Sequence, residues 1–184
     1  MKKTQNLVRI AIMVSIIAIG AFIRIPAPVI GSFTLQLTFV QLAGILLGSK
    51  KGAIAAGVYA LGGFIGIPWF TMGGGFGYIF QPTFGFILAF ILGAFVPGYF
   101  RELAIRKNVN KELTMTIVGS ILSTFIVWIL GIIYLSAIYQ YYLGKDYGYL
   151  AALTSIFSPS LIADLVLAIL ISFIGLRISK AIER

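Results

Sequence analysis

One carboxylate stands out among the side chains that could do chemistry in this sequence. Asp164 is the one acidic or basic residue that we place well inside an apolar segment, about two helical turns from the outer end of the segment at 157–176. A carboxylate at that depth in a membrane is costly unless it is protonated, paired or turned toward a wet cavity. We therefore expect Asp164 to face the protein interior and a ligand pocket that opens outward. The alternative is a structural aspartate that bonds neighbouring helices.

Two amide side chains, Gln36 and Gln41, lie in the second apolar segment, with Thr34 and Thr38 close by. Amide groups in a bilayer need partners, which are either neighbouring helices or a ligand. The two glutamines are five positions apart, so they do not share a helix face. Gln36 is nearer the outer end and is the better ligand candidate, whereas Gln41 is expected to bond between helices.

Residues 69–85 read WFTMGGGFGYIFQPTFG, an aromatic and uncharged stretch. Its glycines allow positive φ and a close approach of backbone to another surface, and Pro82 precedes the fourth apolar segment. Irregular backbone at membrane depth is tolerated where it lines a cavity or is buried in protein. We expect a lid or pocket wall. A flexible external loop is the alternative, although such a loop would not need so many aromatic side chains.

Other chemistries are excluded by composition. The sequence contains no histidine, no cysteine and five acidic residues. Disulfides, thiol nucleophiles, histidine bases and the usual nitrogen and sulfur ligands of zinc are therefore ruled out. A phosphate-binding loop of the Walker type is also absent from the sequence. We predict no catalytic residue, no metal site and no cofactor, and hence a protein that is not an enzyme.

The elements that must position these residues are membrane helices. With 60% apolar and 10% charged residues, the chain does not fit a soluble domain, which has roughly 25% charged residues. A helix needs about 20 apolar residues to cross a hydrocarbon layer of roughly 30 Å. We predict an all-α protein with a single membrane domain (1–184) and six spans, of which the second and third are short. The spans cover about residues 7–23, 33–48, 52–68, 83–100, 114–138 and 157–176.

Lys and Arg are unevenly distributed between the two sides of these spans. Twelve lie on the side that holds both termini and two on the other side. Positive charge near span ends stays in the cytoplasm, so we expect both termini there and read the charge as a topology signal rather than a nucleic-acid site. The twelve are Lys2, Lys3, Arg9, Lys50, Lys51, Arg101, Arg106, Lys107, Lys111, Arg177, Lys180 and Arg184, and the two are Arg24 and Lys145.

Four expected connectors separate the spans besides the glycine-rich stretch. They are a proline-rich segment at 24–32, a short turn at 49–51, a solvated cytoplasmic loop at 101–113 and an outer loop at 139–156. In the first span, Ala11, Ser15 and Ala18 follow at i, i+4 and i+7 and form a smooth face. Small residues allow close helix approach, either to another subunit or within the bundle.

Several short motifs occur together in a characteristic order. They are TLQ at 34–36, LAGILLG at 42–48 followed by Lys50 and Lys51, GIP at 66–68, QPTFGF at 81–86, and the stretch 159–164. In this order and spacing the sequence resembles the BioY family of biotin transporters, the substrate-binding S components of energy-coupling-factor (ECF) importers. The resemblance covers most of the chain.

The resemblance implies a six-helix protein of the bacterial plasma membrane that binds a small vitamin from outside. Such an S component has no ATPase of its own and associates with a transmembrane coupling protein and two ATPase subunits. The face of Ala11, Ser15 and Ala18 matches the docking surface on the first helix of S components.

Two departures from the family pattern concern the ligand. The family usually has Asp-x-x-Lys in the last span, but here Leu167 occupies the lysine position, three residues after Asp164. The usual GPTGGY is QPTFGF at 81–86, so the expected pocket is less charged and more aromatic. Lipoate, whose head is apolar, thereby becomes an alternative to biotin, and both carry a carboxylate tail.

The resemblance also gives each candidate residue a role. Asp164 would accept the ureido N–H groups of biotin, and Gln36 and Gln81 would supply secondary hydrogen bonds. Partners for the carboxylate tail would be Arg24, backbone N–H groups of the glycine loop at Gly74 and Gly75, or Tyr78. The apolar walls would be Trp69, Tyr78, Phe84 and Phe86. A ligand-free membrane scaffold and an ion-coupled carrier remain as alternatives from other classes.

Overall fold

The computed structural model describes residues 2–27, 31–107, 111–144 and 159–182. Within these ranges the chain forms six α-helices, so the predicted all-α class is confirmed, with a short β-ribbon as an addition. Lys145 and Arg184, both used in the charge count, lie outside the described residues. The helices are α1 (Lys2–Phe22), α2 (Gln36–Leu47), α3 (Ser49–Phe64), α4 (Phe84–Arg106), α5 (Glu112–Ala137) and α7 (Pro159–Ile182).

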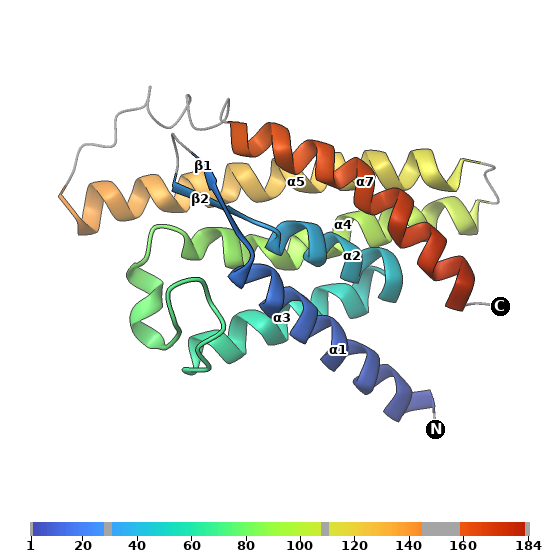
Figure 1. Cartoon of the computed structure of the whole chain (residues 1–184), viewed down its shortest axis with the longest axis horizontal. Helices are drawn as coiled ribbons and strands as arrows, with labels where there is room; N and C mark the ends of the chain where they lie inside the picture. Colours follow the sequence, from blue (N-terminus) through green and yellow to red (C-terminus); the bar gives the residue numbers. More distant parts are fainter. Residues whose placement is uncertain (1, 28–30, 108–110, 145–158, 183–184) are drawn as a thin grey trace.

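Successive helices run in opposite directions along an elongated bundle (Figure 1). The start of α1 and the end of α7 both lie on the right of that view, and we call this side the N/C end. The ribbon and the glycine-rich loop lie toward the other side, which we call the loop end. Because the described helices alternate in direction, the first helix begins and the last helix ends on the same side of the bundle.

Helix length separates the six helices into two groups. Four of them are long and apolar enough to cross a membrane, each with at least 20 residues in the span. With 12 and 16 residues, α2 and α3 are only about 18 and 24 Å long. Nine of the residues of α2 are buried, so this short helix is enclosed by its neighbours rather than exposed along its length.

A single residue, Gly48, joins α2 to α3. Its φ of 84° lies in the left-handed region that favours glycine. Nearby, a Cβ added to Gly44 would lie 1.9 Å from the carbonyl oxygen of Ala94 in α4, so the two backbones are in direct contact. The expected turn at 49–51 is wrong. Gly48 alone reverses the chain, so α3 begins at Ser49, three residues before the predicted start of the third span.

The proline-rich segment is partly a β-ribbon. Strands β1 (Arg24–Ala27) and β2 (Gly31–Thr34) pair antiparallel, with Arg24 opposite Thr34. Pro26 is tolerated because each strand of a two-stranded ribbon has a free edge. The second apolar segment therefore begins as a strand, and its helix starts at Gln36 rather than at residue 33.

The glycine-rich loop between α3 and α4 is irregular, as expected, but contains a short 3₁₀ helix, η1 (Phe76–Phe80). Gly73 and Gly75 both have a φ of 106°, which confirms the expected use of positive φ. The N–H of Gly75 donates to the carbonyl of Gly63 at 2.8 Å. The loop thus folds back onto the end of α3.

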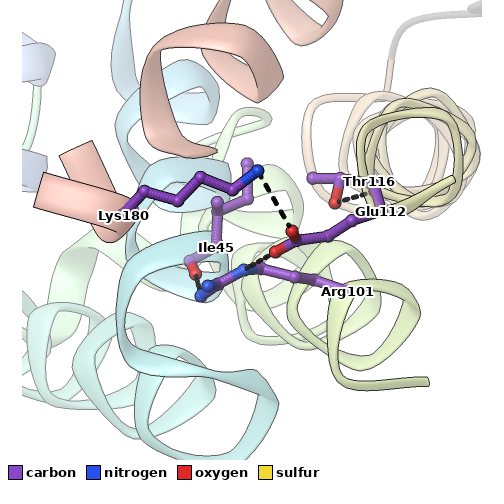
Figure 2. A network of polar contacts seen from close by, with 5 residues as sticks. All are labelled: Ile45, Arg101, Glu112, Thr116 and Lys180. Atoms are coloured by element: carbon purple, nitrogen blue, oxygen red, sulfur yellow. Dashed lines mark hydrogen bonds and ion pairs between the residues drawn. The ribbon is translucent and has the colours of Figure 1, made fainter. Parts of the chain in front are cut away.

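Charged residues at the N/C end form a closed network (Figure 2). Arg101 is 7% exposed; its Nε lies 3.0 Å from Oε1 of Glu112, and its Nη1 donates to the carbonyl of Ile45 at 2.7 Å. Nζ of Lys180 lies 3.6 Å from Oε2 of Glu112. The expected solvated connector at 101–113 is therefore wrong at its start, because α4 continues to Arg106 and buries Arg101 among partners.

Glu102, the next residue of α4, caps α3. Its Oε1 accepts from the backbone N–H of Ser49 at 2.7 Å, and its Oε2 accepts from Oγ of Ser49 at 2.8 Å. Arg101 meanwhile satisfies a C-terminal carbonyl of α2. Helix ends carry unpaired carbonyl and N–H groups with opposite partial charge. Two consecutive residues of α4 therefore bind the C-terminal end of α2 and the N-terminal end of α3, on either side of Gly48.

Candidate functional site

Asp164 lies on α7 and is 8% exposed, so the prediction that it faces the interior is confirmed. Its Oδ2 accepts a hydrogen bond from Nε1 of Trp128 on α5 at 2.8 Å. Among the residues that the structure describes, no donor reaches Oδ1. The indole of Trp128 in turn packs edge-on against Phe86 of α4, with ring centroids 5.8 Å apart. Asp164 therefore has one oxygen fixed and one available.

Gln36 and Trp69 belong to a second group, joined by the fully buried Tyr59 of α3. Nε2 of Gln36 donates to Oη of Tyr59 at 2.6 Å, and that hydroxyl donates to the carbonyl of Trp69 at 3.1 Å. Nε1 of Trp69 returns a bond to the carbonyl of Tyr59 at 2.9 Å. Gln36 is thus part of a clamp that holds the glycine-rich loop on α3.

Aromatic rings of the glycine-rich loop continue this second group. Phe70 packs against Tyr59, Tyr78 and Phe84, with centroids 5.4, 4.6 and 6.4 Å away. Phe84 also meets the ring of Tyr134 on α5 at 6.1 Å. Three of the four predicted wall residues, Trp69, Tyr78 and Phe84, therefore share one aromatic cluster.

The two groups meet along the contact between α4 and α5. Phe84 packs against Tyr134, and Phe86 covers Gly131, where an added Cβ would lie 2.4 Å from the ring. Since Gly131 and Tyr134 are neighbours on one face of α5, the aromatic cluster and the Asp164–Trp128 pair adjoin each other. The loop end thus combines one buried carboxylate with a large aromatic surface.

The remaining predicted residues are placed differently. Arg24 is exposed at the start of β1, and Gly74 is exposed in the loop. A Cβ added to Gly74 would lie 2.4 Å from the carbonyl oxygen of Ile67, so this glycine allows the loop to pack on itself. Gln81 is half-buried just before α4, and its backbone N–H donates to the carbonyl of Tyr78. Within the described ranges no hydrogen bond links the Gln81 side chain to another candidate.

Gln41 forms the centre of a neutral polar layer between α2, α5 and α7. Its Nε2 lies 3.0 Å from the carbonyl of Ser120 and 2.9 Å from Oγ1 of Thr124, and Oγ of Ser172 bonds to Oγ of Ser120 at 3.0 Å. The prediction that Gln41 bonds between helices is confirmed. The layer closes the interior on the N/C side of the Asp164–Trp128 pair.

A model of the BioY family matches residues 1–184. The chain belongs to the BioY family. The probable biotin transporter BioY of Lysinibacillus sphaericus is 36% identical over 179 residues, which cover 97% of this chain and 89% of that relative. The biotin transporter BioY of Thermotoga maritima is 32% identical over 178 residues, or 96% of each chain.

A solved structure extends the likeness to three dimensions. The crystal structure of an S-component for biotin from an ECF-type ABC transporter matches with a TM-score of 0.75 and 28% identity, over 97% of this chain and 93% of that chain. The expected family, and with it a transport protein rather than an enzyme, is therefore confirmed.

The partner of the aspartate in this BioY chain was not predicted. Leu167 stands where the family resemblance led us to expect a lysine, and the described donor to Asp164 is Trp128 from another helix. Tyr59 was missed as well. A tryptophan or tyrosine inside an apolar segment carries one polar atom that needs a partner when buried. That signal, present at both positions, would have drawn attention to them.

The small-residue face on α1 of this BioY chain is only partly accessible. Ala11 and Ser15 are exposed, whereas Ala18 is 8% exposed and belongs to the core. The reason is that α2 covers the second half of α1: a Cβ added to Gly20 would lie 2.6 Å from the ring of Phe39. Ala18 therefore packs within the bundle, and docking of this face to another subunit stays a prediction. The exposed part of the face is at Ala11 and Ser15.

Proposed function

We propose that this chain is the S component of an ECF-type importer that captures biotin outside the bacterial plasma membrane. The observation that carries the proposal is the buried Asp164 carboxylate, which has one oxygen held by Trp128 and lies beside an aromatic surface. Biotin presents two ureido N–H donors and one carbonyl on a head whose remainder is an apolar thioether ring, so it suits such a site. The names of the BioY relatives and of the matching crystal structure support the same ligand.

The proposed orientation puts the N/C end in the cytoplasm. Both ends of the described chain lie on that side (Figure 1), together with basic residues such as Lys51, Arg106 and Arg177. Retention of positive charge inside the cell accounts for this distribution. In this arrangement the chain crosses the bilayer six times, with α2 enclosed by its neighbours and α3 at the edge of the bundle, where Ile54, Val58 and Leu61 are exposed. The loop end then faces the medium.

In the proposed complex, Oδ1 of Asp164 accepts a ureido N–H of biotin. Gln36 and Gln81 supply secondary hydrogen bonds, and the carboxylate tail extends toward Arg24 or the N–H groups of Gly74 and Gly75. The aromatic walls are Trp69, Tyr78, Phe84 and Phe86. These roles follow from the chemistry of each group and its position at the loop end.

Energy for uptake comes from other subunits in this proposal. A transmembrane coupling protein and two ATPases would associate with the chain, and the exposed residues Ala11 and Ser15 offer a smooth surface on α1 for that contact. Small side chains let helix backbones approach closely in a bilayer.

Native mass spectrometry of the purified protein tests the ligand. The protein is exposed to equal concentrations of biotin and lipoate, and we expect retained biotin. Asp164→Asn should retain little, while Lys107→Gln, an exposed charge change at the N/C end, should behave as wild type. Retention of lipoate alone would overturn the choice of ligand, and retention of neither would favour a scaffold.

A further inference from the structure

Thr38 of α2 carries an unusual hydroxyl. Among side-chain nitrogen and oxygen atoms that are fully enclosed in the described part of the chain, its Oγ1 alone lacks a hydrogen-bond partner. Buried threonines of α5 behave differently, since Thr116 donates to the carbonyl of Glu112 and Thr124 to that of Ser120. Buried polar groups without a partner are rare in proteins and call for an explanation.

The direction of Thr38 follows from its helix register. It shares a face of α2 with Gln41 and Leu42, three and four residues later. Gln41 bonds to Thr124 of α5, and Leu42 lies against Gly175 of α7. One turn closer to the loop end, Thr38 therefore faces the space between α5 and α7.

The Asp164–Trp128 pair bridges that same space. Trp128 follows Thr124 by one turn, and Asp164 precedes Ser172 by two turns, so both lie on the loop side of the polar layer. Thr38 consequently lies between the neutral layer around Gln41 and the available oxygen of Asp164.

We propose that the Thr38 hydroxyl is a ligand-contacting group that reads the ureido head of biotin together with Asp164. This inference rests on the proposed function. Asp164 accepts one ureido N–H, and Thr38 donates to the ureido carbonyl. The head group enters first because the layer beneath Thr38 is neutral, so a carboxylate would find no cationic partner there. The tail therefore points to the loop end.

Paired measurements of biotin affinity and of stability without biotin test the assignment. Thr38→Val removes the hydroxyl and keeps the shape, so biotin affinity should fall about tenfold, as expected for one lost hydrogen bond to a ligand. The Tm without biotin should not fall, because no protein bond is lost. Thr38→Ser should bind within about threefold of wild type. Thr116→Val is the matched control. It should lose stability and keep its biotin affinity, because the Thr116 hydroxyl donates to the backbone carbonyl of Glu112.

Three outcomes would overturn the inference. Thr38→Val could bind biotin as tightly as wild type, or Thr38→Ser could be as weak as Thr38→Val, which would assign the effect to packing of the methyl group. With dethiobiotin, which keeps the ureido group and lacks the sulfur, Thr38→Val should show the same loss; a loss confined to biotin would point to the thioether instead. If the wild type itself binds no biotin, the proposed function fails first. Thr38→Ala provides a second hydroxyl-free variant should Thr38→Val not fold.

Discussion

At the N/C end, the carboxylates of Glu102 and Glu112 are matched by charged side chains or by the N-terminal N–H group of a helix. At the loop end, Asp164 has a neutral indole on one oxygen and, among the described residues, no donor on the other. The first arrangement is electrostatically complete and holds helices together (Figure 2). The second leaves a hydrogen-bond acceptor unused in the interior. The comparison separates a structural set of paired carboxylates at the N/C end from one interior carboxylate, Asp164, for which we propose a role in recognition.

The largest expected effect is the loss of biotin binding when Asp164 is replaced. Asp164→Ala should weaken biotin binding and uptake about a hundredfold, because charged hydrogen bonds to a ligand are the strongest in the proposed site. The amount of protein in the membrane should stay near that of wild type. Uptake assays and immunoblots of membranes measure the two quantities. Unchanged uptake would remove Asp164 from the site.

The opposite pattern is expected for Arg101→Met at the N/C end. The change leaves Glu112 without its buried partner and the carbonyl of Ile45 without its donor. Stability should fall by about 2 kcal/mol, below the loss typical of fully buried pairs because Glu112 is partly exposed. Thermal unfolding in detergent measures this loss, with Arg106→Met as an exposed control. Biotin affinity of the folded fraction should be unchanged; a specific loss of affinity would contradict the division between the two ends.

A smaller effect should follow from loss of the indole N–H. Trp128→Phe keeps an aromatic ring against Phe86 but no longer orients Asp164. Biotin affinity should fall about tenfold, the equivalent of roughly 1.4 kcal/mol. Calorimetric titration measures it, and Tyr99→Phe on α4 is the control for loss of a polar atom from a ring. An affinity equal to that of wild type would mean that Asp164 needs no positioning from α5.

The smallest effect is predicted for the cap on α3. Glu102→Ala removes the acceptor for the N–H and hydroxyl of Ser49. Loss of a helix cap costs about 1 kcal/mol, which a shift of the unfolding midpoint would report. Glu102→Gln keeps one acceptor oxygen and should lose less. If the two variants are equally stable, the acceptor oxygen kept in Glu102→Gln contributes nothing to the helix end, which contradicts this expectation.

The sequence predicted much of this fold because composition and apolar runs mark membrane helices well. Asp164 in the interior and Gln41 between helices were also predictable, since polar groups in apolar segments must find partners. The pair of Asp164 with Trp128 was not, because it depends on the relative register of α5 and α7. Burial of Arg101 was missed for a similar reason: a basic residue at the end of an apolar run usually stays at the interface. The ribbon was missed because its strands are four residues long and one contains proline.

The glycine contacts at the Gly48 turn also constrain motion. Backbone touches backbone where Gly44 meets Ala94, and the side chains of Arg101 and Glu102 bind both helix ends at this point. We expect any swing of the α2–α3 hairpin relative to α4 to pivot here, about 18 Å from the start of α2. A small rotation at the pivot moves the residues farthest from Gly48 the most, which are Gln36 at the start of α2 and Phe64 at the end of α3. Thr38, near the start of α2, travels with them.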